Sequence, residues 1–462
     1  MMEPAPTPSY SFIIKLEIKN RPGMFAKVAN VIGTKGGDLR NIEIVKIEKE
    51  FIVRKIYINT INEKHSKEIV DALKELEGIK VLEVIDQTFL MHEGGRIGIY
   101  NKKEIKDHED LARVYTPGVA RVCMEIYKNP ENVYKYTIKG NTVAVITDGS
   151  AVLGLGNIGA LASLPVMEGK CMLFKRFADI DAFPLPISTT DVDEFVNIVK
   201  KISVAFGGIN LEDISAPRCF EIEERLQKEL DIPVVHDDQH GTAIVVLAAL
   251  INVGRLLKED ITQYKIVISG AGASGTAVAK LLLFYGAKNI IVCDSKGAIH
   301  KERKDLNPYK KELALKTNPF GEKGSLKEVL KGAKVFIGLS APNILEREDI
   351  LKMEKDPIIF ALANPVPEIY PEKIQDIAKI IATGRSDYPN QINNALAFPG
   401  LFKGLLMARA KKVTPEIFVE ASKALANVIK EDELNEEYII PSIFNPKVAE
   451  AVAKAVKEKL RS

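Results

Sequence analysis

The amino-acid sequence predicts an α/β protein in which a βαββαβ unit precedes a longer region of alternating strands and helices. The first observation is the order of strand-like and helical segments in residues 10–88. The second is the alternation, from Leu111 onward, of short β-branched runs with segments of helical periodicity, which is typical of a parallel sheet covered on both faces. The third is the length of 462 residues, enough for three domains at about 150 residues each.

The composition excludes several classes of protein. Lys and Arg number 64 and Asp and Glu 62, so the net charge of +2 leaves no excess positive charge for nucleic acid or a membrane surface. The longest apolar run, residues 243–251, is shorter than the roughly 20 residues of a membrane span and predicts a buried helix. Residues 1–8 are rich in proline. They contain no Lys or Arg and no apolar core, so we do not expect a signal peptide. The four cysteines form no Cys-x-x-Cys pair, which favours a reducing, cytoplasmic location and disfavours a disulfide framework.

Residues 10–88 have the segment order of a ferredoxin-like sandwich. Phe25, Val28 and Ile32 recur at helical spacing, and Gly36-Gly37 ends that helix. The expected elements are strands at 10–18, 43–49, 51–60 and 80–88 and helices at 24–35 and 66–76.

This first unit resembles an ACT domain. The resemblance rests on the opening strand, on Asn20-Arg21-Pro22-Gly23 with Met24-Phe25 after it, and on Gly36-Gly37. It implies a regulatory module that pairs with copies of itself and often binds an amino acid. A purely structural dimerisation unit is the alternative, because ferredoxin-like folds host many roles.

The remaining chain alternates strands with helices and is expected to form two domains, at 89–237 and 238–462. The expected strands are 142–147, 208–211, 232–235, 265–269, 290–293, 334–339, 358–362 and 380–382. The expected helices are 191–205, 218–230, 242–257, 415–429 and 446–460.

The pattern G-x-G-x-x-G occurs twice, and its surroundings distinguish the two copies. The second copy follows the predicted strand 265–269 and opens a helix, as in a Rossmann-type NAD(P)-binding domain. Asp294 ends the next strand, where a carboxylate would accept hydrogen bonds from the adenosine ribose and repel a 2′-phosphate. We therefore expect NAD, with NADP left open by the nearby Lys296. The expected cofactor-binding residues are Gly270, Gly272, Ala273, Ser274, Gly275 and Asp294. The first copy, 154–159, is separated from its strand and is expected to line a shared cleft.

Two pairs of acidic residues, Glu212-Asp213 and Asp237-Asp238, each follow a predicted strand. One helix joins these strands, so both pairs are expected at the carboxyl edge of one parallel sheet, where such sheets bind ligands. Four converging carboxylates repel one another unless a cation neutralises them, and oxygen ligands favour Mg²⁺ or Mn²⁺ over zinc. The sequence therefore predicts a divalent metal site.

Two alternatives concern the segment 236–240. Asp238 could cap the helix predicted from Thr242, a role compatible with metal binding. A zinc site formed by His236 and His240 is disfavoured, because His236 ends a predicted strand and the two histidines would have to share a helix.

From about Asn101 to the C-terminus the chain resembles malic enzymes, in their short prokaryotic form. The motifs that carry the resemblance are Val114-Tyr115-Thr116-Pro117-Gly118-Val119-Ala120, Thr147-Asp148-Gly149-Ser150, Gly154-Leu155-Gly156-Asn157-Ile158-Gly159, Glu168-Gly169-Lys170, Leu211-Glu212-Asp213, His236-Asp237-Asp238-Gln239-His240-Gly241-Thr242, Ala363-Asn364-Pro365 and Asn393-Asn394-Ala395.

The resemblance implies oxidative decarboxylation of (S)-malate to pyruvate and CO₂ with reduction of NAD(P), by a chain that is at least a dimer. It makes residues 89–237 the malic-enzyme N-terminal domain and 238–462 the NAD(P)-binding domain with C-terminal helices. The roles it implies are general base for Lys170, general acid for Tyr115, metal ligands for Glu212, Asp213 and Asp238, a supporting role for Asp237, and contact with substrate or nicotinamide for Asn364 and Asn394.

The implied chemistry makes two demands on the chain. Lys170 must be neutral to take the hydroxyl proton, so its pKa must fall through burial or a nearby cation. The secondary-structure pattern places Lys170 at a helix–strand junction, away from the carboxyl edge. Longer members of the family carry an Arg in the Thr-Asp-Gly motif that clamps a substrate carboxylate, and here that position is Ala151. Malate specificity is therefore less firmly implied than the class of reaction.

Two other functions stay open. The first is a malolactic enzyme or another metal-assisted 2-hydroxy-acid dehydrogenase, which net accumulation of NAD(P)H would separate from a malic enzyme. The second is an amino-acid-responsive regulatory protein with an inactive dehydrogenase body. The presence of both acidic pairs and of Asp294 disfavours this function.

Overall fold

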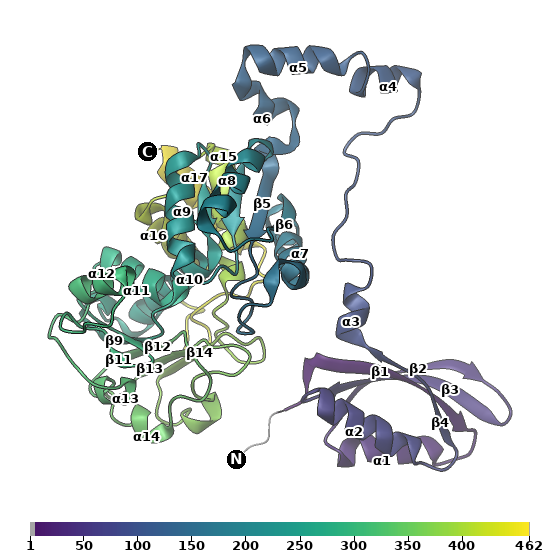
Figure 1. Cartoon of the computed structure of the whole chain (residues 1–462). Coiled ribbons are helices and arrows are strands. Elements are labelled where there is room, and N and C mark those ends of the chain that lie inside the picture. Colours follow the sequence, from purple (N-terminus) through teal and green to yellow (C-terminus); the bar gives the residue numbers. More distant parts are fainter. Residues whose placement is uncertain (1–4, 462) are drawn as a thin grey trace. The chain divides into compact units, whose positions relative to one another are not determined.

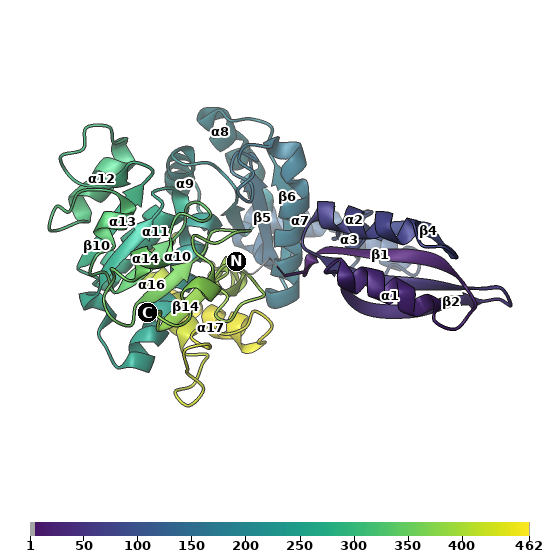
Figure 2. The same cartoon turned by 90° about the horizontal axis from the view of Figure 1, so that it is seen from below.

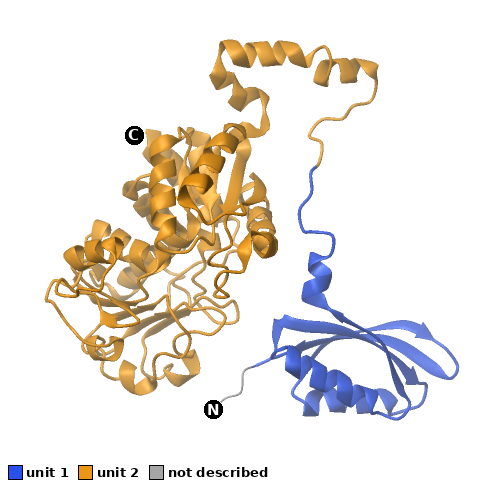
Figure 3. Cartoon of the chain, in the orientation of Figure 1, with its two compact units in different colours: residues 1–99 blue, residues 100–462 orange. Residues whose placement is uncertain are grey.

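The computed structural model describes residues 5–461, and the chain divides into two compact units at residues 99 and 100 (Figure 3). The first four residues of the predicted Pro-rich segment 1–8 lie outside the described range.

The first unit is the predicted ferredoxin-like sandwich. Its elements are β1 Thr7–Lys19, α1 Met24–Thr34, β2 Asp38–Ile47, β3 Phe51–Thr60, α2 Glu63–Lys74 and β4 Ile79–Asp86, followed by the short helix α3 Gln87–His92. The antiparallel sheet has the order β2-β3-β1-β4, and α1 and α2 lie against one of its faces (Figure 1 and Figure 2). Ile14 and Leu16 of β1 pack there with Val28 and Ile32 of α1 and Ile69 of α2. The order of elements is confirmed.

One helix of this unit begins earlier than its apolar pattern suggests. The side chain of Asn62 accepts a hydrogen bond from the backbone N–H of His65, which caps α2 at Glu63 instead of Ser66. The capping interaction therefore adds a polar first turn that hydrophobic periodicity does not reveal.

The second unit contains two parallel sheets. The smaller has the order β6-β5-β7-β8, formed by β5 Thr142–Thr147, β6 Asp181–Pro186, β7 Gly208–Leu211 and β8 Val234–His236. The larger has the order β11-β10-β9-β12-β13-β14, formed by β9 Lys265–Ser269, β10 Asn289–Asp294, β11 Gly297–Ala298, β12 Val335–Gly338, β13 Ile358–Ala361 and β14 Ile380–Thr383. Only β11 is antiparallel to its neighbour among these described strands. The predicted Rossmann-type sheet is confirmed.

Helices connect and cover both sheets. They are α4 His108–Val114, α5 Val119–Lys128, α6 Val133–Tyr136, α7 Gly159–Ala178, α8 Val192–Ile202, α9 Arg218–Glu229, α10 Asp237–Leu257, α11 Ala273–Tyr285, α12 Pro308–Lys316, α13 Leu326–Val329, α14 Arg347–Ile350, α15 Phe398–Ala408, α16 Pro415–Ala426 and α17 Lys447–Arg461.

The sequence pattern did not predict the helix α7, and the reason is the composition of its buried face. Its buried positions recur at helical spacing, but two of them are polar, Ser163 and Lys170, and Pro165 lies within the helix. A buried face that mixes polar and apolar side chains gives no clear hydrophobic stripe. The expectation that Lys170 lies at a helix–strand junction is therefore wrong, because it lies inside α7.

The apolar run 243–251 belongs to α10, as expected of a buried helix. This helix is long and apolar enough to cross a membrane, with a mean hydropathy of 1.6 in its most apolar stretch, but 61% of that stretch is buried inside the unit. Side chains of α10 share one core with Val143 of the smaller sheet, Ile268 of the larger sheet and Phe398 of α15. Residues on both sides of the expected boundary at 237/238 thus belong to one compact unit.

Candidate active site

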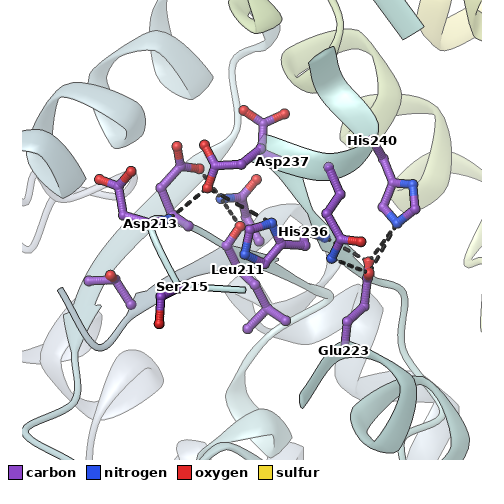
Figure 4. A network of polar contacts seen from close by, with 12 residues as sticks. Leu211, Asp213, Ser215, Glu223, His236, Asp237 and His240 are labelled. Carbon is purple, nitrogen blue, oxygen red and sulfur yellow. Dashed lines mark hydrogen bonds and ion pairs between the residues drawn. The ribbon is translucent and has the colours of Figure 1, made fainter. Parts of the chain in front are cut away.

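Two adjacent parallel strands bring four carboxylates together. The register pairs Leu211 of β7 with His236 of β8, so the next residues of both strands emerge at the same edge. Glu212 and Asp213 follow β7, whereas Asp237 and Asp238 form the first turn of α10 (Figure 4). One oxygen each of Glu212, Asp213 and Asp238 lies within 4.8 Å of the other two. Adjacent strand ends thus create the predicted acidic cluster.

The backbone holds this cluster in place. Asp213 adopts a left-handed conformation with φ of 53°, and its N–H donates to Asp238 Oδ2 at 2.8 Å. The other loop at this edge is tied in as well, because the Ala151 N–H donates to the Asp213 carbonyl at 3.0 Å. Asp213 Oδ2 is buried and has no hydrogen-bond partner among the described residues. An acceptor aimed into the cluster without a donor suits a cation with oxygen ligands.

Lys170 supplies the positive charge inside the cluster. Its Nζ lies 2.6 Å from Asp237 Oδ2, 2.8 Å from Glu212 Oε1 and 4.2 Å from the centre of the Phe398 ring. The side chain is almost fully buried. The helix α7 thus carries Lys170 to the carboxyl edge of the sheet, where the sequence pattern had not placed it.

Burial and neighbouring charges raise the pKa values of the lysine and of the acids, but by different causes. Burial alone would lower the pKa of Lys170, but Asp237, Glu212 and Asp238 outweigh it and hold the pKa above its usual value. Without a cation this arrangement of charges does not lower the pKa of Lys170, so the fall that a general base requires would have to come from a bound cation. Burial and the neighbouring acids raise the pKa of Asp213 to about 9.

The other three carboxyls are also harder to ionise than usual. Burial is the main cause, with Lys170 opposing it and a neighbouring acid adding to it in each case. The pKa rises to about 7 for Glu212 and Asp237 and to about 6 for Asp238. One ammonium does not neutralise four carboxylates, so a divalent cation fits the charge as well as the geometry.

A buried network of Glu223 supports the first turn of α10 (Figure 4). Its carboxylate accepts from the His236 N–H at 2.8 Å and from Gln239 Nε2 at 2.9 Å, and it lies 3.0 Å from His240 Nε2. Burial lowers the pKa of His236 to about 4, so its ring is neutral. The sequence signal for Glu223 is an acid on the otherwise apolar buried face of α9, between Ile222 and Leu226.

The structure contradicts the alternative in which Asp238 caps the helix. Asp238 does not cap α10, because the helix begins at Asp237 and His236 occupies the N-cap position. Among residues 5–461, the group with metal-binding geometry consists of Glu212, Asp213 and Asp238 and contains no histidine.

The second glycine motif forms a tight strand–turn–helix connection. Gly270 has a φ of +114°, and a Cβ there would lie 2.4 Å from the Leu339 carbonyl oxygen. A Cβ on Gly275 would lie 1.9 Å from the Gly270 carbonyl oxygen, so only glycine fits. Gly272 is the N-cap of α11, and Ala273 and Ser274 begin the helix, whose N-terminus is suited to a pyrophosphate.

A cavity of about 1410 Å³ adjoins this turn. Its lining includes Gly270, Gly272, Asp294 at the end of β10, and Tyr309 of α12. The cavity and the glycine turn together provide a place for a dinucleotide.

The two asparagines lie outside the strands, Asn364 in the connection from β13 to β14 and Asn394 at the start of the short 3-10 helix Asn394–Leu396. The Cβ of Asn394 lies 3.1 Å from where a Cβ on Gly241 would stand, one turn along α10 from Asp237. Asn364 follows β13, and its Nδ2 donates to the Gly384 carbonyl at 3.4 Å. A Cβ on Gly154 would lie 3.5 Å from the Asn364 carbonyl oxygen, so the first glycine motif adjoins this loop.

Tyr115 is the expected site residue that the structure does not bring to the cluster. It follows α4 directly, is 67% exposed, and lies between α4 and α5, neither of which contains a buried residue. Sequence reasoning also missed Arg218, which pairs with Asp148 at 2.8 Å and donates to the Thr190 carbonyl at 2.7 Å. Arg218 thus supports the loop that contains Ala151.

Comparison with known proteins identifies three matching family profiles. They are "Malic enzyme, NAD binding domain" over residues 239–461, "Malic enzyme, N-terminal domain" over residues 94–191 and 188–227, and "ACT domain" over residues 7–83.

Individual relatives and structures agree with these matches. The chain is 54% identical over 445 residues to the NAD-dependent malic enzyme of Geobacillus stearothermophilus, covering 96% of this chain and 93% of that protein. It is 53% identical over 364 residues to the bifunctional malic/malolactic enzyme of Bacillus subtilis, covering 78% and 89%. The crystal structure of the NAD-dependent malic enzyme of Thermotoga maritima matches with a TM-score of 0.78 and 48% identity, covering 81% of this chain and 99% of that one.

Proposed function

The chain belongs to the malic enzyme family, and we propose that it converts (S)-malate to pyruvate and CO₂ with reduction of NAD(P), using a divalent cation at the acidic cluster. The observation that supports this most directly is the cluster itself, in which three carboxylates converge beside the buried ammonium of Lys170.

The carboxylates of Glu212, Asp213 and Asp238 would hold Mg²⁺ or Mn²⁺. When bound, the cation would supply Lewis-acid polarisation of the malate oxygens and charge stabilisation during decarboxylation. The glycine turn at Gly270 would hold the dinucleotide, which would supply the hydride acceptor, and Asn364 and Asn394 would lie close to the substrate end.

Lys170 would take the hydroxyl proton of malate. Its high pKa is due to the carboxylates around it, above all Asp237 and Glu212. When these carboxylates balance a cation, they no longer retain the proton on Lys170, and the neutral amine can act as a base. Asp237, at 2.6 Å, holds the amine in position and offers an acceptor for its proton.

Tyr115 would donate a proton to the carbon that loses CO₂. Because its side chain is exposed between α4 and α5, this role requires the segment to fold over a site, either in the same chain or in a second copy. Mixing inactive Tyr115→Phe and Lys170→Met chains distinguishes the two. Restored turnover supports action on a second copy, and its absence in proven mixed oligomers supports action within one chain.

The test of the main proposal is a spectrophotometric assay of the whole chain with malate, NAD or NADP, and Mn²⁺ or a chelator. We expect reduced cofactor and pyruvate in equal amounts, and loss of turnover on chelation that Mn²⁺ restores. Full turnover in chelator-treated protein would contradict the metal-dependent mechanism.

A malolactic reaction is a second candidate, because a relative with 53% identity is named a bifunctional malic/malolactic enzyme. Product analysis separates the two reactions, since the malolactic route yields lactate with no net reduction of the cofactor. Pyruvate with stoichiometric NADH excludes the malolactic reaction as the main activity.

The ACT domain suggests regulation by an amino acid in a homo-oligomer, at least a dimer. The unpaired cysteines favour a cytoplasmic location for it. A screen of the amino acids for a change in turnover or melting temperature of the full chain tests this proposal. The absence of any effect would favour a structural role for the unit. Absence of turnover together with amino-acid binding would instead favour the regulatory protein with an inactive body.

A further inference from the structure

The dinucleotide cavity carries an excess of positive charge around Asp294. Apart from His300, its charged lining residues are four cations and two carboxylates, namely Lys296, Arg303, Lys310, Lys327, Asp294 and Asp305. Asp294 stands at the end of β10, the position from which a carboxylate would reach the adenosine ribose.

Asp294 is already fully engaged with donors. Its Oδ1 accepts from Arg303 Nη1 at 2.8 Å and from the Lys296 backbone N–H at 3.0 Å. Its Oδ2 accepts from Arg303 Nη2 at 3.1 Å and from Lys310 Nζ at 2.7 Å. A carboxylate offers about four acceptor positions, so ribose hydroxyls would have to compete with these donors. Burial would raise the pKa of Asp294, but the bonds from Arg303 and Lys310 lower it to about 2.

The two cations around Asp294 differ in freedom. Arg303 is held on both sides, since its Nε and Nη2 also donate to Asp305 at 3.0 and 2.8 Å, and its side chain is only 11% exposed. Lys310 projects from α12 with 27% exposure and gives one of its three ammonium protons to Asp294. Arg303 is therefore a fixed counter-charge, whereas Lys310 retains donors that face the cavity it lines.

A carboxylate at this position normally excludes NADP by repelling its 2′-phosphate. Here two cations within 3.1 Å cancel that repulsion. Lys296, whose side chain is 69% exposed and whose Nζ pairs with Asp305 Oδ2 at 2.9 Å, adds a third cation to the lining of the same cavity. We propose that Arg303 neutralises Asp294 and that Lys310, with Lys296, binds the 2′-phosphate, so that the chain accepts NADP as well as NAD. The inference rests on the proposed function and specifies the cofactor preference of that site.

The test is calorimetric titration of the full chain, without malate or metal, with AMP and with adenosine 2′,5′-bisphosphate. These probes differ only in the 2′-phosphate. We expect the bisphosphate to bind about tenfold more tightly, as one charge-assisted contact would give. Lys310→Met should remove about that tenfold preference and leave AMP binding nearly unchanged. Lys301→Met, which removes a nearby exposed charge outside the cavity lining, is the matched control and should change neither.

Equal binding of the two probes, or an equal loss of both in Lys310→Met, would overturn the inference. Asp294→Asn adds an independent check, because it should increase the preference for the bisphosphate by releasing the two cations. The readout is separate from turnover. A chain that prefers the bisphosphate but does not oxidise malate contradicts only the proposed function, whereas one that oxidises malate but ignores the 2′-phosphate contradicts only this inference.

Discussion

Replacement of Lys170 by Met tests the electrostatic account of the active site. The substitution keeps the length and apolar stem of the side chain but removes the only ammonium that contacts Asp237 and Glu212, at 2.6 and 2.8 Å, among the described residues. Removing one partner of a buried ion pair costs about 3–5 kcal/mol of folding free energy, because the remaining charges stay buried without compensation. For a unit of this size, that loss corresponds to a fall in melting temperature of roughly 5 °C.

The effect of Mn²⁺ on the melting temperature of the same variant distinguishes the loss of a charge from the loss of packing. Mn²⁺ at 100 times its dissociation constant stabilises a protein by about 2.7 kcal/mol. In Lys170→Met the four carboxylates have no other Lys or Arg in contact within residues 5–461, so we expect tighter Mn²⁺ binding and a larger melting shift than in the parent chain. Turnover with malate should fall by about 10²–10⁴-fold, the usual contribution of a general base.

Differential scanning calorimetry with and without Mn²⁺, together with the malate assay, measures these effects. Lys175→Met is the matched control, since Lys175 lies on the same helix but pairs with Asp179 and Asp181 nearer the surface, where an ion pair contributes about 0–1 kcal/mol. Unchanged melting of Lys170→Met without metal, or weaker Mn²⁺ binding than in the parent chain, would refute the reasoning.

Three further predictions follow from single contacts. Gly275→Ala should abolish NAD binding and lower the melting temperature, because its Cβ would meet the Gly270 carbonyl at 1.9 Å, whereas Gly272→Ala meets no atom within 4 Å and should keep the parent melting temperature. Asp213→Asn should leave the melting temperature without metal nearly unchanged at neutral pH, because a carboxyl with a pKa of about 9 is already protonated there, but should weaken Mn²⁺ binding by about tenfold or more in a calorimetric titration. The stabilisation due to ionised Asp294, whose pKa of about 2 lies below the unfolded value of about 3.9, should persist above about pH 4 and disappear as the pH falls to about 2. The difference in melting temperature between the parent chain and Asp294→Asn measures it, and a difference that vanishes already at pH 6 would contradict the assignment.

The convergence of the acidic residues was predictable because their geometry follows from local rules. An acid pair directly after each of two parallel strands must lie at one edge, and the short strands ending at Leu211 and His236 could be identified from sequence. The glycine turn was predictable for a similar reason, since strand, glycine spacing and helix are contiguous in the chain. Lys170 and Glu223 could not be placed this way, because each is a charged residue on a helix face that packs against other buried groups.

The sequence by itself determined the order of the elements, the edge at which the acids gather and the turn that accepts a dinucleotide, because these depend on contiguous residues and on the period of apolar side chains. The tertiary structure alone decided the charge states. Lys170 meets Asp237 from 67 positions away, and Asp294 meets Lys310 from 16 positions away. Electrostatic interaction depends on distance in space and on burial, so the protonation of Lys170 and the neutralisation of Asp294 appear only once the helices that carry their partners have packed.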